Sequence, residues 1–356
     1  MRLGVFLPTG NDGWILSRNS PHYMPTFDLN KSIVSRAEAF GLSIGLGMLT
    51  FRGYGGETEH WDYTSEPLTQ TAALLAATTS MQIFATCGVL ALHPAMVARM
   101  AATIDDVAPG RFGLNIVTGW HRAEYAQMGM WPGDNWFQTR YDYATEWASI
   151  FRDLTDTGHT DFKGRYIEVS DCKMGFRPRG GIKIAAAGQS GKGREFAGRF
   201  ADYNFTSAID RSSIEAANSQ IRASTSRDVR VLSQRMVILD DTDDLAKKRV
   251  DYYEDGADLG AIATLKGEND LDPTHADRLR MRGDRLAIDG GNMANLYAGS
   301  PKTVARKINE LASIGGLEGL LFSFDDFVEG LDRFGTEVVP LLDFDISAGG
   351  GPVRSA

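Results

Sequence analysis

The chain has 356 residues, of which 43% are hydrophobic and 23% are charged, and its formal net charge is −9. This length and composition fit one large globular α/β domain with a substantial core. The acidic balance argues against a nucleic-acid partner, because a basic stripe is missing. The one dense basic group is interpreted as a solvated helix face or loop rather than an anion site; it consists of Arg278, Arg280, Arg282 and Arg285.

The cysteines and histidines do not have the spacing of a metal site, so we expect no metal. Cys87 and Cys172 stand far apart, and no two of the six histidines are four residues apart. Two thiols in a long chain favour a reducing compartment. The first residues resemble a strand more than a signal peptide, and no run of ~18 apolar residues occurs. We therefore expect a cytoplasmic protein without a membrane segment.

Short apolar segments alternate with segments of helical periodicity along the chain. Strands are predicted at residues 2–8, 44–48, 81–86, 111–118, 182–187, 203–207, 229–239 and 317–324. Helices are predicted at residues 27–40, 68–79, 97–107, 141–154, 192–201, 244–253, 303–314 and 327–342. Ser300 is the expected N-cap of one helix, with Pro301 at its first position.

About eight strand–helix pairs predict a (β/α)₈ TIM barrel. A doubly wound sheet is disfavoured because the first strand is not followed by G-x-G-x-x-G. We expect a single barrel domain over residues 1–347. A small β-hairpin is expected at 160–169, centred on Lys163 and Gly164, and the Gly-, Ser- and Pro-rich residues 348–356 are expected to be a flexible tail.

Two stretches, at about 119–138 and 256–298, exceed the usual length of a loop. In a TIM barrel, long loops that follow strands lie on the active face. We therefore expect both to be active-face insertions that form substrate walls or lids. For the second stretch, a disordered insertion without a role is an equal alternative.

Asn115 is a polar residue near the C-terminal end of a predicted strand, where TIM barrels carry their active-site residues. A polar side chain inside a barrel needs hydrogen bonds, either from the core or from a bound cofactor ring. Its position favours the cofactor. Thr86 ends an earlier strand, and Met48 and Leu49 end another, so that together they suit a flat heteroaromatic ring. Trp120 directly follows Gly119 at a strand end, which favours a wall of a substrate pocket over ordinary packing.

Polar residues that follow these strands suit a polyhydroxylated chain ending in phosphate. Arg140 offers a fork of donors that matches phosphate, and Glu124 can accept from a hydroxyl. The segment 187–193, A-G-Q-S-G-K-G, follows a strand and opens a helix, where backbone N–H groups bind anions. It lacks Walker A spacing, which disfavours nucleotide hydrolysis. Solvated charges and an ordinary strand–helix turn are the alternatives. A G-x-S-x-G elbow is also missing, which disfavours a hydrolase.

The motifs N-I-V-T-G-W-x-x-x-E-Y at 115–125, R-Y-D at 140–142 and A-G-Q-S at 187–190 resemble the bacterial-luciferase-like, two-component FMN monooxygenases. The likeness is greatest to members that act on pyrimidines. It is nearly continuous over residues 1–205 and resumes over about 298–343. The resemblance implies a TIM barrel that takes reduced FMN from a separate NAD(P)H-dependent flavin reductase and reacts it with O2. We also expect a homo-oligomer.

Carried over position by position, the resemblance implies a set of FMN contacts at Met48, Leu49, Asn115, Glu124, Arg140, Tyr141 and Ser190. Thr86 and Asn115 would border the oxygen site, and Trp120 would lie beside the substrate. The implied reaction is oxidative ring-opening of uracil, thymine or a related pyrimidine, through a flavin peroxide, to a ureidoacrylate peracid.

The chain departs from the family pattern at several places. Thr50 stands where Lys is expected, Cys87 stands where Ala is expected, and residues 206–297 match poorly. The reaction class therefore carries over better than the substrate. One alternative is a luciferase-like FMN monooxygenase acting on another N-heterocycle, an amide, a sulfone or a sulfonate. Another is a flavin-binding barrel without turnover, which Asn115 and Thr86 speak against.

Overall fold

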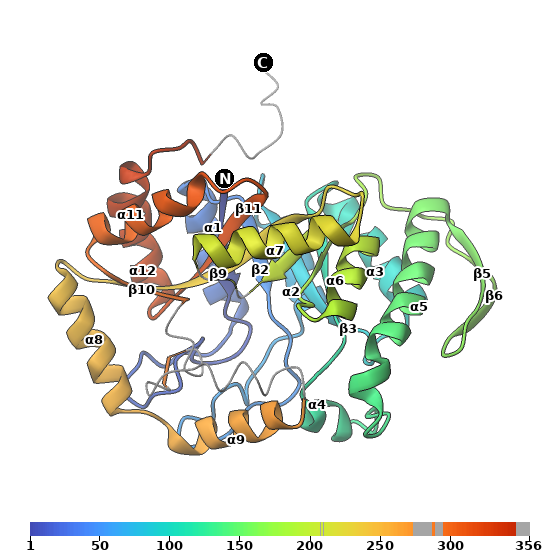
Figure 1. Ribbon diagram of the computed structural model, residues 1–356, viewed down its shortest axis with the longest axis horizontal. Coiled ribbons are helices and arrows are strands. Elements are labelled where there is room, and N and C mark those ends of the chain that lie inside the picture. Colours follow the sequence, from blue (N-terminus) through green and yellow to red (C-terminus); the bar gives the residue numbers. More distant parts are fainter. Residues whose placement is uncertain (207, 209, 273–286, 289–294, 347–356) are drawn as a thin grey trace.

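The computed structural model describes most of the chain, and its overall shape is shown in Figure 1. Residues 207, 209, 273–286, 289–294 and 347–356 lie outside the described residues. The arginine group at 278–285, much of the predicted second insertion and the predicted tail therefore fall outside the description.

Eight parallel strands close into a barrel, which confirms the predicted fold. They are β1 (Arg2–Leu7), β2 (Ile44–Gly47), β3 (Gln82–Gly88), β4 (Phe112–Val117), β7 (Lys183–Ala186), β8 (Tyr203–Thr206), β9 (Arg230–Leu239) and β11 (Leu317–Phe324). The strands follow this order around the ring, and β1 pairs with β11 in parallel. The ring has no open edge, which satisfies the backbone groups of every strand.

Helices cover the outside of the barrel. They are α1 (Phe27–Ala39), α2 (Pro67–Ala76), α3 (Pro94–Val107), α5 (Trp136–Thr157), α6 (Gly191–Phe200), α7 (Arg211–Ser224), α8 (Asp243–Asp255), α11 (Pro301–Ala312) and α12 (Phe327–Arg333). The predicted N-cap Ser300 and first-turn Pro301 of α11 are confirmed. The Ser300 hydroxyl donates to Asp243 at 2.9 Å, which ties α11 to α8.

The predicted helix 327–342 is correct only in its first part. After α12 the chain continues as a π-helix at Phe334–Val338 and a 3₁₀ turn at Val339–Leu341. Pro340 has no N–H for an α-helical hydrogen bond. A Cβ on Gly335 would lie 2.2 Å from the Phe40 ring, so the glycine allows α1 to pack closely there.

Several elements were not predicted: α4 (Arg122–Ala126), α7, α9 (Leu259–Asp270) and β10 (Leu296–Gly299). The helix α9 corrects the expectation that its segment is a loop. α7 contains four Ser residues, and its only buried large apolar side chains are Ile214 and Ile221, so few apolar residues mark it in the sequence. The predicted hairpin is present as β5 (His159–Lys163) and β6 (Glu168–Lys173).

The strand β10 extends the barrel wall on one side of β9. Met236 and Val237 of β9 pair with β11 and also with β10, so these two strands lie on opposite edges of β9. Earlier in β9, Val231 pairs with both β8 and β11. β10 therefore lies on the same edge as β8, beyond the point where β8 ends.

The inside of the barrel is filled by side chains. The buried cluster there consists of Ile44, Leu46, Phe84, Ala185, Tyr203, Leu232 and Leu321. A Cβ on Gly113 would lie 2.3 Å from the Phe84 ring, so the glycine makes room for this plug. A ligand therefore finds space at the C-terminal mouth, above the plug.

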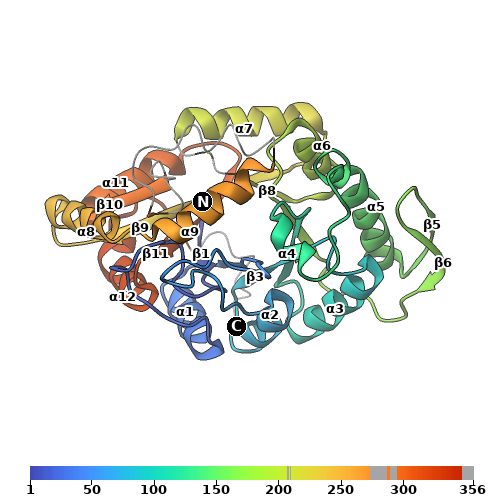
Figure 2. The same ribbon diagram turned by 90° about the horizontal axis from the view of Figure 1, so that it is seen from below.

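The C-terminal ends of the strands point to the lower side of Figure 1, where α4 and α9 lie. Figure 2 looks onto this face and shows both helices over the ring of strands. The loop after β1 joins the loop after β2 through the bridge between Gly10 and Thr64. These loops and helices form the surroundings of the mouth.

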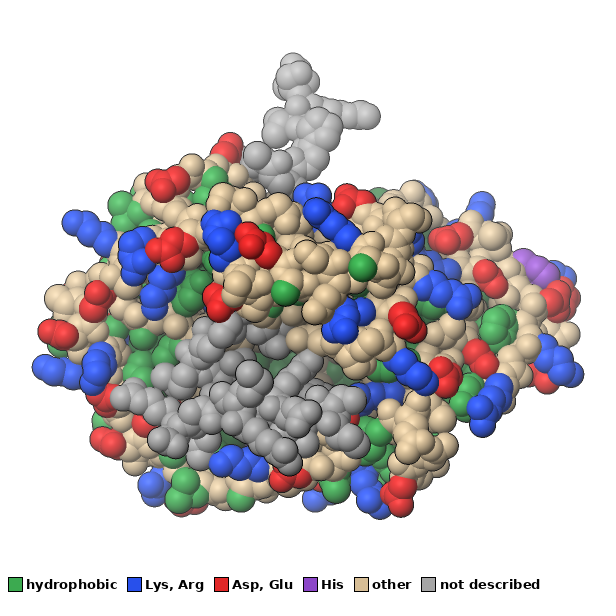
Figure 3. All heavy atoms as spheres, in the orientation of Figure 1, with side chains coloured by type: hydrophobic (Ala, Val, Ile, Leu, Met, Phe, Trp, Pro, Cys, Tyr) green, Lys and Arg blue, Asp and Glu red, His purple; other side chains and the backbone are tan. Residues whose placement is uncertain are grey.

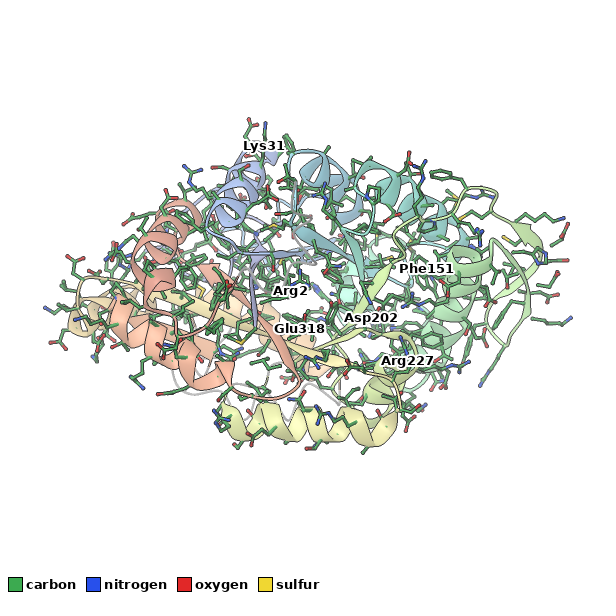
Figure 4. The ribbon with its side chains drawn as sticks, turned by 90° about the horizontal axis from the view of Figure 1, so that it is seen from above. Arg2, Lys31, Phe151, Asp202, Arg227 and Glu318 are labelled. Atoms are coloured by element: carbon green, nitrogen blue, oxygen red, sulfur yellow. The ribbon has the colours of Figure 1, made fainter. Side chains whose placement is uncertain are left out.

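Charged side chains lie at the other end of the barrel, where the strands begin. Figure 4 shows this end from above, with Arg2, Asp202 and Glu318 labelled. Arg2 donates to Gln82 at 3.0 Å. Asp202 pairs with Lys183 at 3.0 Å and with Arg152 at 3.3 Å. These contacts join β1 to β3 across the end of β2, and they join the residue before β8 to β7 and α5, as expected for the stabilising face of a TIM barrel.

Over the described part of the face in Figure 3, positive and negative side chains are interspersed. Among the described helices, none combines the length and apolar character needed to cross a membrane.

Candidate active site

Asn115 and Thr86 lie next to each other at the mouth of the barrel. Asn115 pairs in register with Thr86 of β3 and with Ala185 of β7, and Ala185 belongs to the internal plug. Side chains in register on adjacent strands share a face, so Asn115 and Thr86 point into the barrel. The predicted neighbourhood of these two residues is therefore present.

A short hydrogen-bond chain fixes how the Asn115 amide is turned. The Thr86 hydroxyl donates to the carbonyl of Gly47 at 2.6 Å, and Asn115 Nδ2 donates to Thr86 Oγ1 at 3.0 Å. Because the Thr86 proton is used on Gly47, Thr86 can only accept from Asn115.

The Oδ1 atom of Asn115 is consequently left without a hydrogen-bond partner among the described residues, although Asn115 is only 5% exposed. An unsatisfied buried acceptor costs roughly 1–3 kcal/mol. Such an atom at the mouth of a barrel marks a place for a ligand N–H or O–H.

Met48 and Leu49 form an apolar border beside this amide. Met48 is buried, and its carbonyl accepts from the Thr9 hydroxyl at 2.8 Å. The Leu49 side chain lies against the end of β3, where a Cβ on Gly88 would be 3.2 Å from it. The ends of β2, β3 and β4 thus place soft apolar groups next to a polar pair, as the sequence predicted.

Glu124 links the loop after β4 to the loop after β2. It is 7% exposed, and its Oε1 accepts from the Thr50 hydroxyl and from the backbone N–H of Phe51 at 3.2 Å. Thr50, the residue that departs from the family pattern, therefore contacts the carboxylate directly.

Arg140 lies in the first turns of α5 and forms a buried ion pair. Its Nη1 lies 2.7 Å from Oδ2 of Asp272, and the two side chains are 5% and 0% exposed. Its guanidinium also lies over the rings of Phe137 and Tyr141. Asp272 comes from the second long stretch, and sequence reasoning missed it because nothing in its local pattern marks it.

Tyr141 and Ser190 meet at the start of α6. Ser190 is the N-cap of this helix, and its hydroxyl accepts from the N–H of Gly193 at 3.2 Å. A Cβ on Gly188 or Gly193 would lie within 2.8 Å of the Tyr141 hydroxyl. These glycines let the tyrosine pack against the helix start, whose N–H groups suit an anion.

A polar cavity of about 270 Å³ adjoins this helix start. It lies between the β7–α6 turn, β8 and α7, and is lined by Gln189, Arg194, Asn204, Thr206, Ala208, Ser213, Ala216, Ala217 and Gln220. Arg194 and the polar side chains suit a charged group.

Trp120 is the end of a row of aromatic rings under α9. Its ring stacks on His121 at 5.5 Å, and His121 stacks on Tyr54 at 5.4 Å. Tyr54 also stacks on His60, and the ring centroids of His60 and Trp61 lie 5.2 Å apart in a further stacked pair. Because the members come from two irregular loops, no periodicity in the sequence announces the row.

Both histidines of this row are buried, and their ring nitrogens have no hydrogen-bond partner among the described residues. Burial lowers the pKa of His60 to about 3, with the nearby Asp258 acting in the opposite direction. The His60 ring is therefore neutral at physiological pH.

Neither cysteine belongs to a described metal cluster. Cys87 and Cys172 are free, and burial raises the pKa of the Cys87 thiol to about 12. Within the described parts of the chain, no three His, Cys, Asp or Glu side chains gather as metal ligands.

These features fit a flavin. The unpaired Asn115 Oδ1 suits a ring N–H, Met48 offers an apolar surface for a flat ring, and the start of α6 suits a phosphate. The arrangement can hold a heteroaromatic cofactor at the mouth and place a second ligand toward the aromatic row.

The model of the luciferase-like monooxygenase family matches residues 1–318, and the chain belongs to this family. It is a flavin-dependent monooxygenase whose co-substrate is O2, and the resemblance seen in the motifs is confirmed. Among its relatives is the pyrimidine monooxygenase RutA of Pseudomonas savastanoi pv. phaseolicola. The two are 44% identical over 348 residues, which is 96% of each chain.

Two solved structures share the fold. EDTA monooxygenase from Chelativorans sp. BNC1 has a TM-score of 0.81 and 18% identity, covering 99% of this chain and 95% of its own. A riboflavin lyase with modified FMN and the substrate riboflavin has a TM-score of 0.78 and 20% identity, and the match covers 96% of this chain and 91% of the lyase. At such identities the likeness concerns the fold alone.

Proposed function

We propose that the chain is an FMN-dependent pyrimidine monooxygenase, which opens the ring of uracil, thymine or a related pyrimidine to a ureidoacrylate peracid. It would receive reduced FMN from a separate NAD(P)H-dependent flavin reductase. The identity to the pyrimidine monooxygenase RutA over nearly the whole chain supports the substrate class. The observation that carries the proposal is the unpaired acceptor of Asn115 beside Thr86 at the barrel mouth.

In this proposal the protein binds and orients its ligands, and reduced FMN supplies the two electrons for O2 reduction. Asn115 accepts a hydrogen bond from the flavin ring and, with Thr86, borders the oxygen site. Met48 and Leu49 contact the ring, and Trp120 borders the substrate. The remaining FMN contacts are made by Glu124, Arg140, Tyr141 and Ser190.

The phosphate of FMN is proposed to lie at the start of α6. Ser190 and the N–H groups of the first turn suit an anion, and Arg140 of the neighbouring α5, which pairs with Asp272, would contact FMN as the resemblance implies. The polar cavity beside Arg194 supports this placement.

The test is a reconstituted reaction with purified protein, FMN, a flavin reductase, NADH and ¹⁸O₂. Uracil, thymine, lactams and sulfones are supplied in parallel, and products are identified by mass spectrometry. An ¹⁸O-labelled, ring-opened product from a pyrimidine is expected. If only another class of compound is oxidised, the alternative substrate is correct and the pyrimidine assignment is wrong.

A matched pair of variants links the product to the site. Asn115→Ala is expected to lower product formation by roughly 10²–10³-fold, whereas Asn309→Ala, at a partly exposed position of α11, is expected to leave it unchanged. The side chain of Asn309 donates to the carbonyl of Leu341 at 3.2 Å and accepts from the N–H of Asp343 at 3.0 Å, and none of these residues belongs to the proposed site.

A cytoplasmic location and a homo-oligomer are part of the proposal. The two free thiols support a reducing compartment. Light scattering after gel filtration measures the mass of the particle, and a monomer would contradict this part.

A further inference from the structure

His121 lies between two carboxylates that belong to different elements. Its Nδ1 atom faces Oε1 of Glu124 in α4 at 3.4 Å, and its Nε2 atom faces Oε2 of Glu268 in α9 at 3.7 Å. No other arrangement in the described chain puts one buried imidazole between two carboxylates at its two ring nitrogens.

Both carboxylates are anchored by other groups, whereas the imidazole is held by ring stacking. Glu268 accepts from the N–H of Ala123 at 3.4 Å, and Glu124 accepts from Phe51 at 3.2 Å. His121 is stacked between the rings of Trp120 and Tyr54. Its nitrogens have no hydrogen bond, and shortening each gap by less than 1 Å would reach the usual distance of ~2.7–3.2 Å.

The three side chains lead from the surface to the mouth. The side chain of Glu268 is 17% exposed, that of His121 is 2% exposed, and that of Glu124 is 9% exposed. Glu124 contacts Thr50, the residue that follows Leu49 at the end of β2. Water can therefore reach the outer carboxylate, while the inner one lies at the proposed flavin site.

The reaction class requires a proton from solvent. Reoxidation of the reduced flavin anion follows FMNH⁻ + O₂ + H⁺ → FMN + H₂O₂. Ring-opening of a pyrimidine to a peracid, which keeps both atoms of O₂, also consumes one proton for each FMNH⁻. A closed, water-excluding site needs a route for it. Imidazole suits such a route because it can accept at one nitrogen and release at the other.

We propose that Glu268, His121 and Glu124 form a proton relay between solvent and the flavin site. Glu268 takes a proton from water and passes it to Nε2 of His121. The ring releases its Nδ1 proton to Glu124, which delivers it to the site, and the ring then returns to its first tautomer. The relay rests on the flavin and oxygen chemistry of the proposed function and is independent of the pyrimidine.

A purely structural histidine is the competing explanation, and variants separate the two. His121→Phe keeps an aromatic ring between Trp120 and Tyr54 but cannot carry a proton. Glu268→Gln keeps the shape of the side chain nearest to solvent, but its amide cannot take up and release a proton as the carboxylate does. Asp270→Asn, an exposed carboxylate two residues further along α9, is the matched control.

The kinetic test needs no substrate. Protein loaded with reduced FMN is mixed with oxygen in a stopped-flow instrument, in H₂O and D₂O and over a pH series. His121→Phe is expected to slow flavin reoxidation on the order of 10²-fold, the usual range for a lost acid–base group. Glu268→Gln is expected to slow it less, with partial rescue by small carboxylate buffers and by Glu268→Asp. Asp270→Asn is expected to match the wild type.

A second readout needs no flavin. In ¹⁵N-histidine NMR spectra, the Nε2 signal of His121 is expected to move in Glu268→Gln, because the carboxylate that faces this nitrogen at 3.7 Å is lost. Unchanged His121 ring signals together with unchanged reoxidation rates, isotope effects and pH profiles would overturn the relay. Wild-type protein that reoxidises FMN but oxidises no pyrimidine would instead contradict the proposed substrate and leave the relay intact.

Discussion

Replacement of Asn115 by Ala tests whether this residue binds a ligand or stabilises the core. The substitution removes the hydrogen bond to Thr86 Oγ1 and also removes the unpaired Oδ1. If Asn115 serves the core, the protein without flavin should lose stability. If it serves a ligand, the loss should appear in flavin binding and in turnover.

The expected magnitudes follow from the contacts. Losing a neutral hydrogen bond costs about 0.5–1.5 kcal/mol, and removing an unsatisfied buried acceptor returns roughly 1–3 kcal/mol. The two effects nearly cancel, so the free energy of unfolding without flavin is expected to change by less than about 2 kcal/mol. With flavin, the lost acceptor weakens binding by up to about tenfold, since ~1.4 kcal/mol corresponds to a factor of ten. Turnover is expected to fall by roughly 10²–10³-fold, as for other preorganised polar contacts.

Three measurements check this prediction: chemical unfolding without flavin, a fluorescence titration with FMN, and product formation. Thr86→Val is the comparison variant, because it keeps the shape of the side chain and leaves Asn115 Nδ2 and the Gly47 carbonyl without their present partners. It is expected to destabilise the flavin-free protein by roughly 1–3 kcal/mol. A large loss of stability in Asn115→Ala, with FMN affinity and turnover unchanged, would refute the ligand role.

Three further predictions concern other parts of the chain. Gly193→Ala places a Cβ 2.7 Å from the Gly188 Cα and should weaken FMN binding more than about tenfold, whereas Gly191→Ala, with open space around it, should bind normally in the same titration. Burial holds the pKa of His60 at about 3, below the ~6.5 of an unfolded chain. The unfolded chain therefore binds a proton at a higher pH than the folded chain, and the free energy of unfolding falls as pH drops from ~6.5 toward 3. His60→Leu should therefore flatten the decline in unfolding free energy between pH 7 and pH 4, and an equal decline would count against this. Although burial raises the pKa of Glu38, the N–H groups of Ser80, Met81 and Thr79 hold it at about 2. Because Glu38 is partly exposed, we expect Glu38→Gln to lower the free energy of unfolding by only about 1–2 kcal/mol near neutral pH, measured by chemical unfolding. The difference between variant and wild type should vanish as pH falls from 4.5 to 2.

The barrel was predictable because its strands are short, apolar and separated by amphipathic helices. The same regularity places Thr86 and Asn115 correctly, since both end neighbouring strands and alternation fixes their direction. Their mutual hydrogen bond was not predictable, because it depends on the register and on the carbonyl of Gly47.

The parts that escaped prediction belong to irregular segments. Asp272 and Glu268 come from the second long stretch, where α9 buries little more than Ala261 and Ile262 and has no clear apolar stripe. Tyr54 and His60 lie in a loop that folds back on itself through the bridge between Gly55 and His60. Tertiary contacts, rather than local periodicity, decide where such residues lie.

The pairing of β1 with β11 has a consequence for how the chain is made. Leu3 pairs with Leu320, and 310 residues separate the end of β1 at Leu7 from the start of β11 at Leu317. At ~5–20 residues per second, a ribosome needs roughly 15–60 s to produce that interval. During this time β1 has an unpaired edge that can recruit a strand from another chain. Synthesis of β11 therefore ends the period in which this edge of β1 lacks its partner, and slow translation before β11 lengthens that period.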